Sequence, residues 1–271
     1  MDIEKGNIMK VYGADFSGAV NPGRGIYYAE GFLSGGSLEI IKVAHCEDRL
    51  DLFTAVHGSN APWGLDFPFS LTMEAYKTLN AGSRQDFSNK LLFCPRRDYY
   101  RWIEGENIPT CEARCKELSL CCRAGDAAVN AFSPLKRTNP NMLAMTYAGL
   151  KFLAYLQSLG VAVYPFDRLN TKASRVYEVY PSHTWKQLGL SCSIDFVEFK
   201  KRFGRLYGLA LNFADEIQVD SLDAADAVAA CITMAYAIYH LGIEEDWTKQ
   251  HSWVRDIEWE RRFTEGLIVR I

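Results

Sequence analysis

Several features that define other protein classes are missing from this sequence. It has no long hydrophobic run, since the longest uncharged apolar stretch, 227–241, is too short to span a bilayer comfortably. It has no internal repeat and no low-complexity segment. Residues 1–13 lack the apolar core of a secretory signal. We therefore expect a cytoplasmic protein with no membrane partner.

An excess of charge of one sign is also missing. The chain has 30 Lys and Arg residues and 33 Asp and Glu residues, for a net charge of -3. This balance excludes a basic coat over the whole surface, of the kind that binds nucleic acid without other help. It still allows a local basic patch.

Cysteine is too sparse for a disulfide scaffold. Eight Cys residues are spread over 271 positions, and in a reducing compartment we expect most of them to be buried thiols. Apolar residues, by contrast, are plentiful. The composition of 48% hydrophobic and 23% charged residues is that of a globular protein with a sizeable core, in one large domain or two small ones.

Three segments rich in β-branched and aromatic residues follow one another near the start: "IMKVYGADFSG", "IYYAEGFLSGG" and "SLEIIKVAH". Turn residues separate them, which predicts an antiparallel meander of three strands. Helical spacing in "EDRLDLFTAVHGS" predicts a short helix, and "APWGLDFPF" predicts a buried strand interrupted by Pro68. The first of these strands ends at Asp15 and the fourth at Asp66.

The rest of the chain is predicted to be mostly helical. Residues 70–160 carry a helical pattern with irregular pieces and end in the amphipathic segment "NMLAMTYAGLKFLAYLQSLG". "VAVYPF" and "SRVYEVYPSHTW" predict two more strands, and "DFVEFKKRFGRLYGL" predicts a helix with a basic face. The segment from Leu222 is apolar almost all round, which predicts a buried helix.

Two acids lie on that apolar helix. Asp223 and Asp226 are three positions apart and therefore share a face. The helix dipole favours an acid in the first turn, which explains Asp223. Asp226 is followed by "AVAA", and a buried carboxylate needs a partner cation, a metal ion or a raised pKa. The helix alone leaves two alternatives, a capped structural helix and a functional acid pair.

Asp15 and Asp66 favour the functional alternative because each ends an apolar strand, at a sheet edge that a helix carrying Asp223 and Asp226 can reach. Four converging carboxylates repel one another unless cations lie between them, and ligands that are all oxygen suit Mg²⁺ or Mn²⁺. Two such ions about 4 Å apart would activate a water molecule and stabilise the leaving oxygen of a phosphodiester. Glu178, on an otherwise apolar strand, is a further catalytic candidate, as a fifth ligand or a supporting group.

The order of these motifs resembles the ribonuclease-H-like superfamily. "GADFSG", "GLDFPF" and "DAADAVAA" occur in its order, and the last is similar to the C-terminal helix of RuvC-type Holliday-junction resolvases. The chain more closely resembles the family catalogued as domain of unknown function 429, whose members are predicted ribonuclease-H-like nucleases. The segments that carry this resemblance span nearly the whole chain: "VYGADFSGA", "WGLDFPFS", "CRAGDAAVNAFSP", "VYEVYPSHTW" and "SLDAADAVAA".

The resemblance implies an α/β fold with a central mixed five-stranded sheet, in which three antiparallel strands are followed by parallel strands and helices flank both faces. It implies a single domain over 1–271, with 70–160 as a mainly helical insertion. It also implies that the metal-binding acids are Asp15, Asp66, Asp223 and Asp226. RuvC-type enzymes have Glu where this chain has Asp66, so the shorter side chain would shift a metal ion.

Three further residues are candidates for substrate binding. Arg123 would contact a phosphate while Asp126 orients its loop, the alternative being an ordinary surface ion pair. Lys136, beside Arg137, would reach a phosphate or simply be solvated. Ser17 follows the first acid, but no G-x-S-x-G elbow surrounds it, so its hydroxyl would contact the substrate or cap the turn rather than act as a nucleophile.

Other polar clusters have simpler explanations. A C-x3-C-x5-C-C spacing suggests zinc but lacks a C-x2-C knuckle and a nearby His, so we favour a helical segment with buried and partly exposed thiols. His183 is a candidate proton shuttle or a structural turn residue. The cysteines of this spacing are Cys111, Cys115, Cys121 and Cys122. The basic face of the helix predicted over 195–209 would follow a nucleic-acid backbone or be solvated, and its residues are Lys200, Lys201, Arg202 and Arg205.

Three functional hypotheses follow. The first is an Mg²⁺- or Mn²⁺-dependent nuclease that uses a two-metal mechanism on DNA or RNA. The second is an actin-like ATP-binding or phosphotransfer protein, because "GADFSGAVNPGRG" is similar to a phosphate loop; however, "GLDFPFS" has Pro and Phe where a second loop needs glycines. The third is a non-catalytic binding protein on the same fold. Each hypothesis allows an oligomer.

Overall fold

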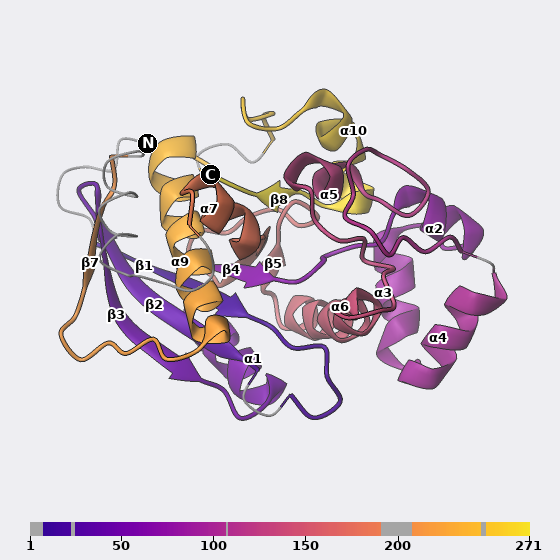
Figure 1. The fold of residues 1–271 in the computed structure, drawn as a ribbon, viewed down its shortest axis with the longest axis horizontal. Coiled ribbons are helices and arrows are strands. Elements are labelled where there is room, and N and C mark those ends of the chain that lie inside the picture. Colours follow the sequence, from indigo (N-terminus) through magenta and orange to yellow (C-terminus); the bar gives the residue numbers. More distant parts are fainter. Residues whose placement is uncertain (1–7, 23–24, 107, 191–207, 245–247) are drawn as a thin grey trace.

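The computed structural model describes residues 8–22, 25–106, 108–190, 208–244 and 248–271, and it has an α/β fold with one mixed sheet of eight strands (Figure 1). The strand order is β5-β6-β4-β1-β2-β3-β7, with β8 paired to β6. The strands are β1 (Met9–Asp15), β2 (Tyr27–Ser34), β3 (Ser37–His45), β4 (Pro62–Asp66), β5 (Ala162–Val163), β6 (Arg175–Val179), β7 (Ala210–Phe213) and β8 (Ile268–Val269).

The N-terminal half of the sheet confirms the predicted meander. Strands β1, β2 and β3 pair antiparallel, whereas β4 lies parallel to β1 and β6 lies parallel to β4. Gly35 and Gly36, which join β2 to β3, have φ angles of 55° and 81°. Positive φ at both central residues is what a two-residue hairpin turn matched to strand twist requires, and glycine adopts it freely.

The five-stranded sheet that the resemblance implied is too small, because eight strands pair among the described residues, six of them in segments that the sequence pattern predicted as strands. Strands β7 and β8 were not expected from the sequence. They contain 4 and 2 residues, too few for an alternating pattern to be visible. Both pair at the outer parts of the sheet, β7 with β3 and β8 with the C-terminal half of β6.

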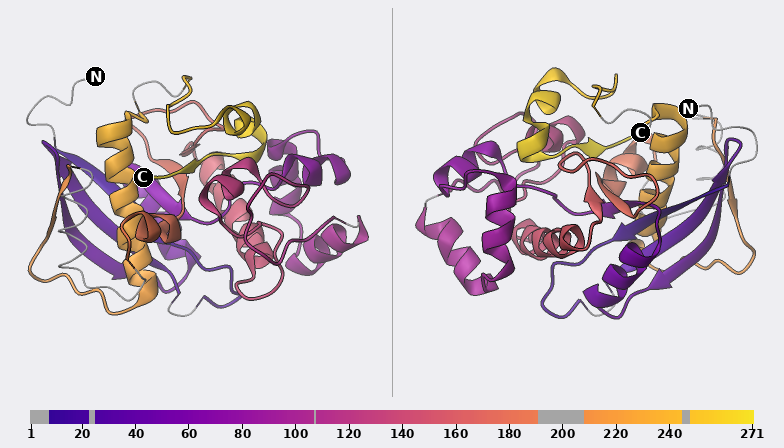
Figure 2. Two further views of the ribbon diagram at one scale, coloured as in Figure 1. Left: turned by 45° about the horizontal axis from the view of Figure 1, so that its top comes forward. Right: turned by 180° about the vertical axis from the view of Figure 1, so that it is seen from behind.

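Helices cover both faces of the sheet (Figure 2). Helix α9 packs against β1, β2 and β4 on one face, with α7 beside it, and α1 and α6 pack on the opposite face. The helices are α1 (Arg49–Gly58), α2 (Met73–Thr78), α3 (Arg84–Leu92), α4 (Arg96–Gly105), α5 (Ala124–Val129), α6 (Met142–Ser158), α7 (Pro181–Gln187), α9 (Leu222–Leu241) and α10 (Asp256–Glu265).

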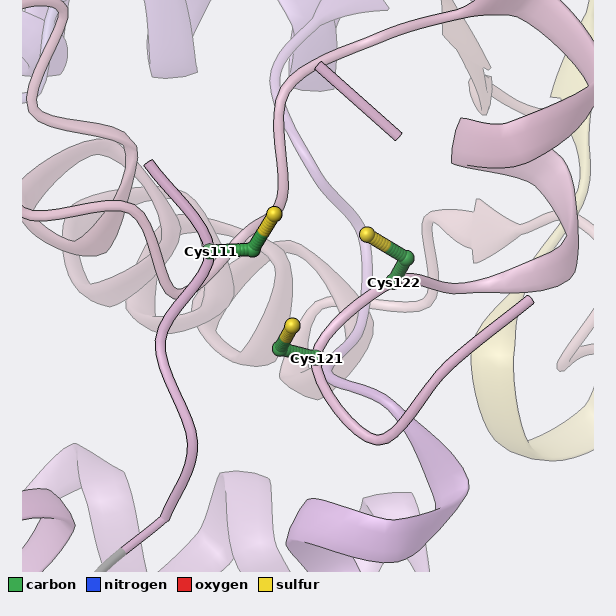
Figure 3. Close-up of side chains that lie close together, drawn as sticks. All are labelled: Cys111, Cys121 and Cys122. Atoms are coloured by element: carbon green, nitrogen blue, oxygen red, sulfur yellow. The ribbon is translucent and has the colours of Figure 1, made fainter. Parts of the chain in front are cut away.

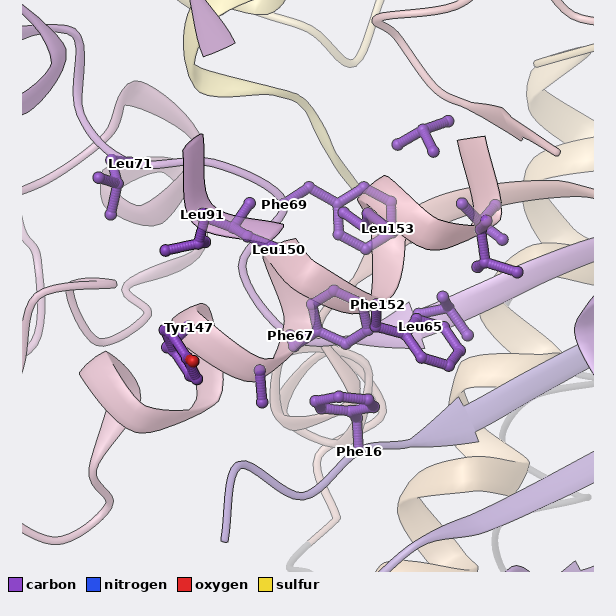
Figure 4. Packing of buried hydrophobic residues seen from close by; sticks show 14 of the residues in the cluster. Phe16, Leu65, Phe67, Phe69, Leu71, Leu91, Tyr147, Leu150, Phe152 and Leu153 are labelled. Carbon is purple, nitrogen blue, oxygen red and sulfur yellow. The ribbon is translucent and has the colours of Figure 1, made fainter. Parts of the chain in front are cut away.

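A group of aromatic side chains packs on the α6 face of the sheet. Phe16 and Phe67, which directly follow β1 and β4, have ring centroids 4.4 Å apart, and Phe152 of α6 packs edge-on against both (Figure 4). Residues 70–160 hold α2 to α6, so this segment contributes α6 to the main core. The core under the sheet therefore includes part of the segment that the sequence suggested was an insertion.

The α9 face is packed unusually closely. A Cβ atom at Gly13 of β1 would lie 2.0 Å from the backbone nitrogen of Cys231, and one at Gly64 of β4 would lie 2.7 Å from Met234 Cγ. The backbone of α9 therefore lies directly on β1 and β4. Glycine on the strands and alanine on the helix allow this approach, which sets the position of the N-terminal turns of α9.

Helix α9 is also the one helix among the described residues that is long and apolar enough to span a membrane. Of its most apolar window, 72% is buried inside the protein, because the helix packs on the sheet. Its composition is thus that of a core helix. The basic helix predicted over 195–209, with its Lys and Arg residues at 200–205, lies outside the described residues apart from its last two positions.

Candidate functional site

Asp15 and Asp66 lie side by side at the ends of two neighbouring parallel strands. The register of β1 and β4 pairs them directly, and adjacent strands are about 4.8 Å apart. Side chains alternate along a strand, so Asp15 projects on the same face as Gly13, and Asp66 on the same face as Gly64. Both glycines contact α9. The two carboxylates therefore project on the α9 face of the sheet.

Helix α9 brings Asp223 and Asp226 to the same place. Its N-cap is Ser221, whose hydroxyl accepts a hydrogen bond from the Ala224 backbone N–H, so both acids fall in the first two turns. The indole Nε1–H of Trp185, on α7, donates to Asp226 Oδ1 at 2.5 Å. This hydrogen bond fixes the orientation of Oδ1 of Asp226. The sequence did not predict a contact between Trp185 and Asp226.

The electrostatics of the four acids show that they interact. Burial, followed by the charge of Asp66 and then of Asp226 and Asp223, raises the pKa of Asp15. Burial and the charge of Asp226 and then Glu178 raise the pKa of Asp66. Burial raises the pKa of Asp226 to about 6, with Asp223 adding to the rise and the Trp185 hydrogen bond opposing it. Each carboxylate therefore disfavours ionisation of its neighbours.

No described Lys or Arg forms an ion pair with any of these four aspartates. Their one backbone hydrogen bond among the described contacts is from Phe16 N–H to Asp15 Oδ1, at 3.0 Å. The four aspartates are not tightly grouped. In the described part of the chain, the one set of three ligand atoms within 4.8 Å of one another belongs to cysteines and not to these acids. The donor set is all oxygen and has no described protein cation paired with it, which is the ligand chemistry that hard divalent ions prefer.

Glu178 does not join this cluster. Its partner in the register is Leu65, which packs in the α6 core, so Glu178 lies on the opposite face from Asp66. It accepts hydrogen bonds from Arg123 and from the Phe69 backbone N–H, at 3.0 Å for the latter. A small cavity of about 40 Å³ touches both Asp66 and Glu178. Glu178 therefore lies behind Asp66 as a supporting group and is not a fifth ligand.

Arg123 is buried, and its role differs from the predicted phosphate contact. Its guanidinium donates to Asp126 from Nε and Nη2, at 2.9 and 2.7 Å. It donates to Glu178 from Nη1 and Nη2, at 2.9 and 2.5 Å, and to the backbone oxygen of Glu265 at 3.1 Å. These contacts use all five N–H donors. Arg123, Asp126 and Glu178 therefore form a buried structural triad. The Arg123–Asp126 pair is neither a surface ion pair nor a substrate contact.

Lys136 and Ser17 also have structural partners. Lys136 is 2% exposed, and its Nζ donates to Thr138 Oγ1 at 2.6 Å and to the Asn139 backbone oxygen at 2.9 Å. Its ammonium group therefore stabilises its own loop, and it is neither a phosphate contact nor solvated. The Ser17 hydroxyl accepts from the Ala19 N–H at 3.3 Å, which agrees with the turn-capping alternative.

His183 lies on α7, with its Nε2 3.2 Å from Gln187 Nε2. Burial lowers its pKa, and the nearby charges of Arg270 and Lys186 add to this effect. The ring thus favours the neutral form. Its described hydrogen bonds involve the Gln187 amide and the backbone of Ile271 and Val129, and none involves the acid cluster, so the structural alternative explains it.

The cysteine segment is not the predicted helix. Residues 108–123 hold isolated bridges but no helix, and Cys115 and Cys122 form a disulfide. The sulfur atoms of Cys111, Cys121 and Cys122 lie within 4.8 Å of one another (Figure 3). Because the disulfide occupies two of the four sulfurs, this arrangement does not present the four thiolates of a structural zinc site.

Comparisons with protein-family models, with curated proteins and with solved structures find no match to this chain. The interpretation of the site therefore depends on its geometry. Two strands and a helix bring four aspartates together at the C-terminal ends of β1 and β4, and Trp185 orients one of them. Clustered carboxylates are the chemistry by which proteins bind hard divalent cations.

Proposed function

We propose that this protein is a metal-dependent phosphodiesterase that acts on nucleic acid, with a ribonuclease-H-like core. The observation that carries the proposal is the direct pairing of Asp15 with Asp66, with Asp226 of α9 close enough to raise the pKa of both. The sheet order β3-β2-β1-β4-β6, antiparallel and then parallel, supports the same core. The burial of α9 against the sheet makes it a core helix of this fold.

Each acid has a distinct part in this proposal. Asp15 and Asp66 would hold Mg²⁺ or Mn²⁺ from the two strand ends, and Asp223 and Asp226 would complete the ligand set from α9. Trp185 fixes Oδ1 of Asp226 and leaves Oδ2 available. When bound, such ions activate a water molecule and stabilise a leaving phosphodiester oxygen. The Arg123–Glu178 pair behind Asp66 would hold the end of β4 in place.

The experiment is a cleavage assay with Mn²⁺ on a panel of single strands, duplexes, RNA–DNA hybrids and junctions. We expect cleavage of at least one class by the native protein and a loss of about a hundredfold or more in Asp15→Asn and Asp66→Asn. Asp215→Asn is the matched control, since Asp215 is exposed and lies outside the cluster. Failure of the native protein on every substrate would refute the nuclease proposal.

The same preparation separates the other two hypotheses. Thermal stabilisation by ATP, with no cleavage, would favour an actin-like ATP-binding protein. Binding of nucleic acid with neither cleavage nor a metal site would favour a non-catalytic binding protein. The loop after β1 begins with Phe16 and packs on α6, and no described contact favours ATP over a nucleic-acid strand.

A further inference from the structure

A second site lies on the face of the sheet opposite the aspartates. It is a pocket of about 540 Å³ between α1, α6 and the start of α4. Pockets that bind small molecules have volumes of roughly 300–1,000 Å³. The pocket is thus large enough for a small organic ligand, and neither the proposed nuclease site nor the sequence motifs account for it.

Three cations line this pocket and no acid does. They are Arg49 of α1, Arg96 of α4 and Lys151 of α6. None of the three forms an ion pair with a carboxylate of the described residues. Burial and the charge of Arg96 lower the pKa of Arg49, which means that the fold holds like charges together. An anion in the pocket would offset that repulsion.

The two arginines are held in place by the loop after β1. Arg49 donates to the Ser17 backbone oxygen from Nε and Nη2, at 3.1 and 2.9 Å, and Arg96 Nη2 donates to the Gly18 oxygen at 2.7 Å. A Cβ atom at Gly18 would lie 2.4 Å from Met145 Cα, so this loop is pressed onto α6. These contacts leave other guanidinium donors for a ligand, on side chains that are already oriented.

Aromatic rings make up most of the remaining wall. Tyr147 lies between two of the cations, with Arg96 Cζ and Lys151 Nζ each 5.4 Å from its ring centroid. Figure 4 shows Tyr147 and Phe152 on the same helix. Phe53 of α1 faces Phe152 edge-on at 6.1 Å, and Tyr155 stands at the rim, half exposed. Flat apolar rings beside cations are the chemistry that recognises a base joined to a phosphate.

We propose that this pocket is a nucleotide-binding site, in which Arg49, Arg96 and Lys151 bind a phosphate and the aromatic wall stacks on the base. The ligand is either a free nucleotide or one nucleotide of a strand. The site needs neither the aspartates nor a metal ion, so it goes beyond the proposed cleavage. It is joined to that function through residues 17–19, which accept hydrogen bonds from the two arginines and lie two to four positions after Asp15.

Binding in the presence of EDTA tests this proposal and is independent of the nuclease assay. The full chain is titrated calorimetrically with adenosine 5′-monophosphate, adenosine, inorganic phosphate and a short single-stranded oligonucleotide. We expect the monophosphate or the oligonucleotide to bind more tightly than adenosine or phosphate alone, and the affinity to fall with added salt. If the oligonucleotide binds far more tightly than the monophosphate, the natural ligand is a strand; the reverse order identifies a free nucleotide.

The variants locate the site. Lys151→Ala and the double variant Arg96→Ala/Lys151→Ala should weaken binding by roughly tenfold or more per cation removed. Tyr155→Ala, at the exposed rim, is a second variant that should fold normally and lose stacking. Lys172→Ala, an exposed lysine outside the pocket, is the matched control. The proposal is overturned if no nucleotide binds, if phosphate alone binds equally well, or if the pocket variants bind like the native chain.

Discussion

Asp15 and Asp66 are direct partners in the register of two parallel strands, at the position where both strands end. Burial raises the pKa of both carboxyls. The charge of Asp66 adds to the rise at Asp15, and the charges of Asp226 and Glu178 add to it at Asp66. A fold that maintains this pair without a basic partner stores an unfavourable interaction. Binding of a divalent cation would relieve it, and this relief is the basis of the first two predictions.

Metal binding should stabilise the native protein. Saturation with Mn²⁺ at about a hundred times its dissociation constant would add about 2.7 kcal/mol to the free energy of unfolding. In the native protein and in the control Asp215→Asn, the melting temperature should be higher with Mn²⁺ than with EDTA. If Asp66→Asn melts at the same temperature with Mn²⁺ and with EDTA, the result agrees with the assigned site. If Mn²⁺ stabilises this variant as much as the native protein, the metal binds elsewhere.

Without metal, stability should fall as the pH rises through the range set by Asp226. Its pKa is about 6 in the folded protein against 3.8 ordinarily, so the folded state binds the extra proton. The stabilising contribution is complete below about pH 4 and is lost as the pH rises through 6, by up to about 3 kcal/mol. Urea unfolding in EDTA between pH 4.5 and 7.5 measures it. Asp226→Asn should show a flatter profile, and an equal slope in both proteins would contradict the assignment.

Removal of the Arg123 guanidinium should destabilise the fold strongly. Arg123→Met leaves Asp126 and Glu178 as two buried carboxylates without a cation, which costs about 3–5 kcal/mol. The free energy of unfolding in urea is the measurement. Arg97→Met, at an exposed arginine of α4, is the control and should change stability by less than about 1 kcal/mol. A small effect at Arg123 would mean that the triad is solvated.

A methyl group at Gly13 should disturb the packing of α9 on the sheet. Gly13→Ala places a Cβ atom 2.0 Å from the Cys231 nitrogen, in backbone that cannot give way easily. We expect a loss of at least about 3 kcal/mol in the free energy of unfolding, together with weaker metal binding because Asp223 and Asp226 move with the helix. Gly82→Ala, where nothing lies within 4 Å of the added atom, is the control. Native stability in Gly13→Ala would show that α9 lies further from β1.

The disulfide between Cys115 and Cys122 makes a simple prediction by mass spectrometry. Intact native protein should weigh less than its reduced form by the mass of two hydrogen atoms, and peptide mapping should join these two residues. Cys46, a buried thiol directly after β3, should remain unpaired. If zinc is bound instead, the denatured protein will release one equivalent of the metal, with all of its thiols free.

The sequence by itself predicted the first half of the architecture well, because local signals are strong there. Gly-Gly at a hairpin, turn residues between apolar segments and an acid at each strand end predicted β1 to β4 and the positions of Asp15 and Asp66. The helical spacing of Asp223 and Asp226 likewise needed only the period of a helix. Those four residues were identified without knowledge of any long-range contact.

The tertiary structure alone decided the roles of Glu178, Arg123 and the pocket. All of β6 is buried, so its sequence does not alternate and does not indicate on which face Glu178 lies. The partners of Arg123 come from segments 55 and 142 residues away, and no local pattern records such a pairing. The three pocket cations come from three helices that meet only in the folded chain. Sequence determined which chemistry was present, and packing determined which groups were neutralised internally and which remained available to a ligand.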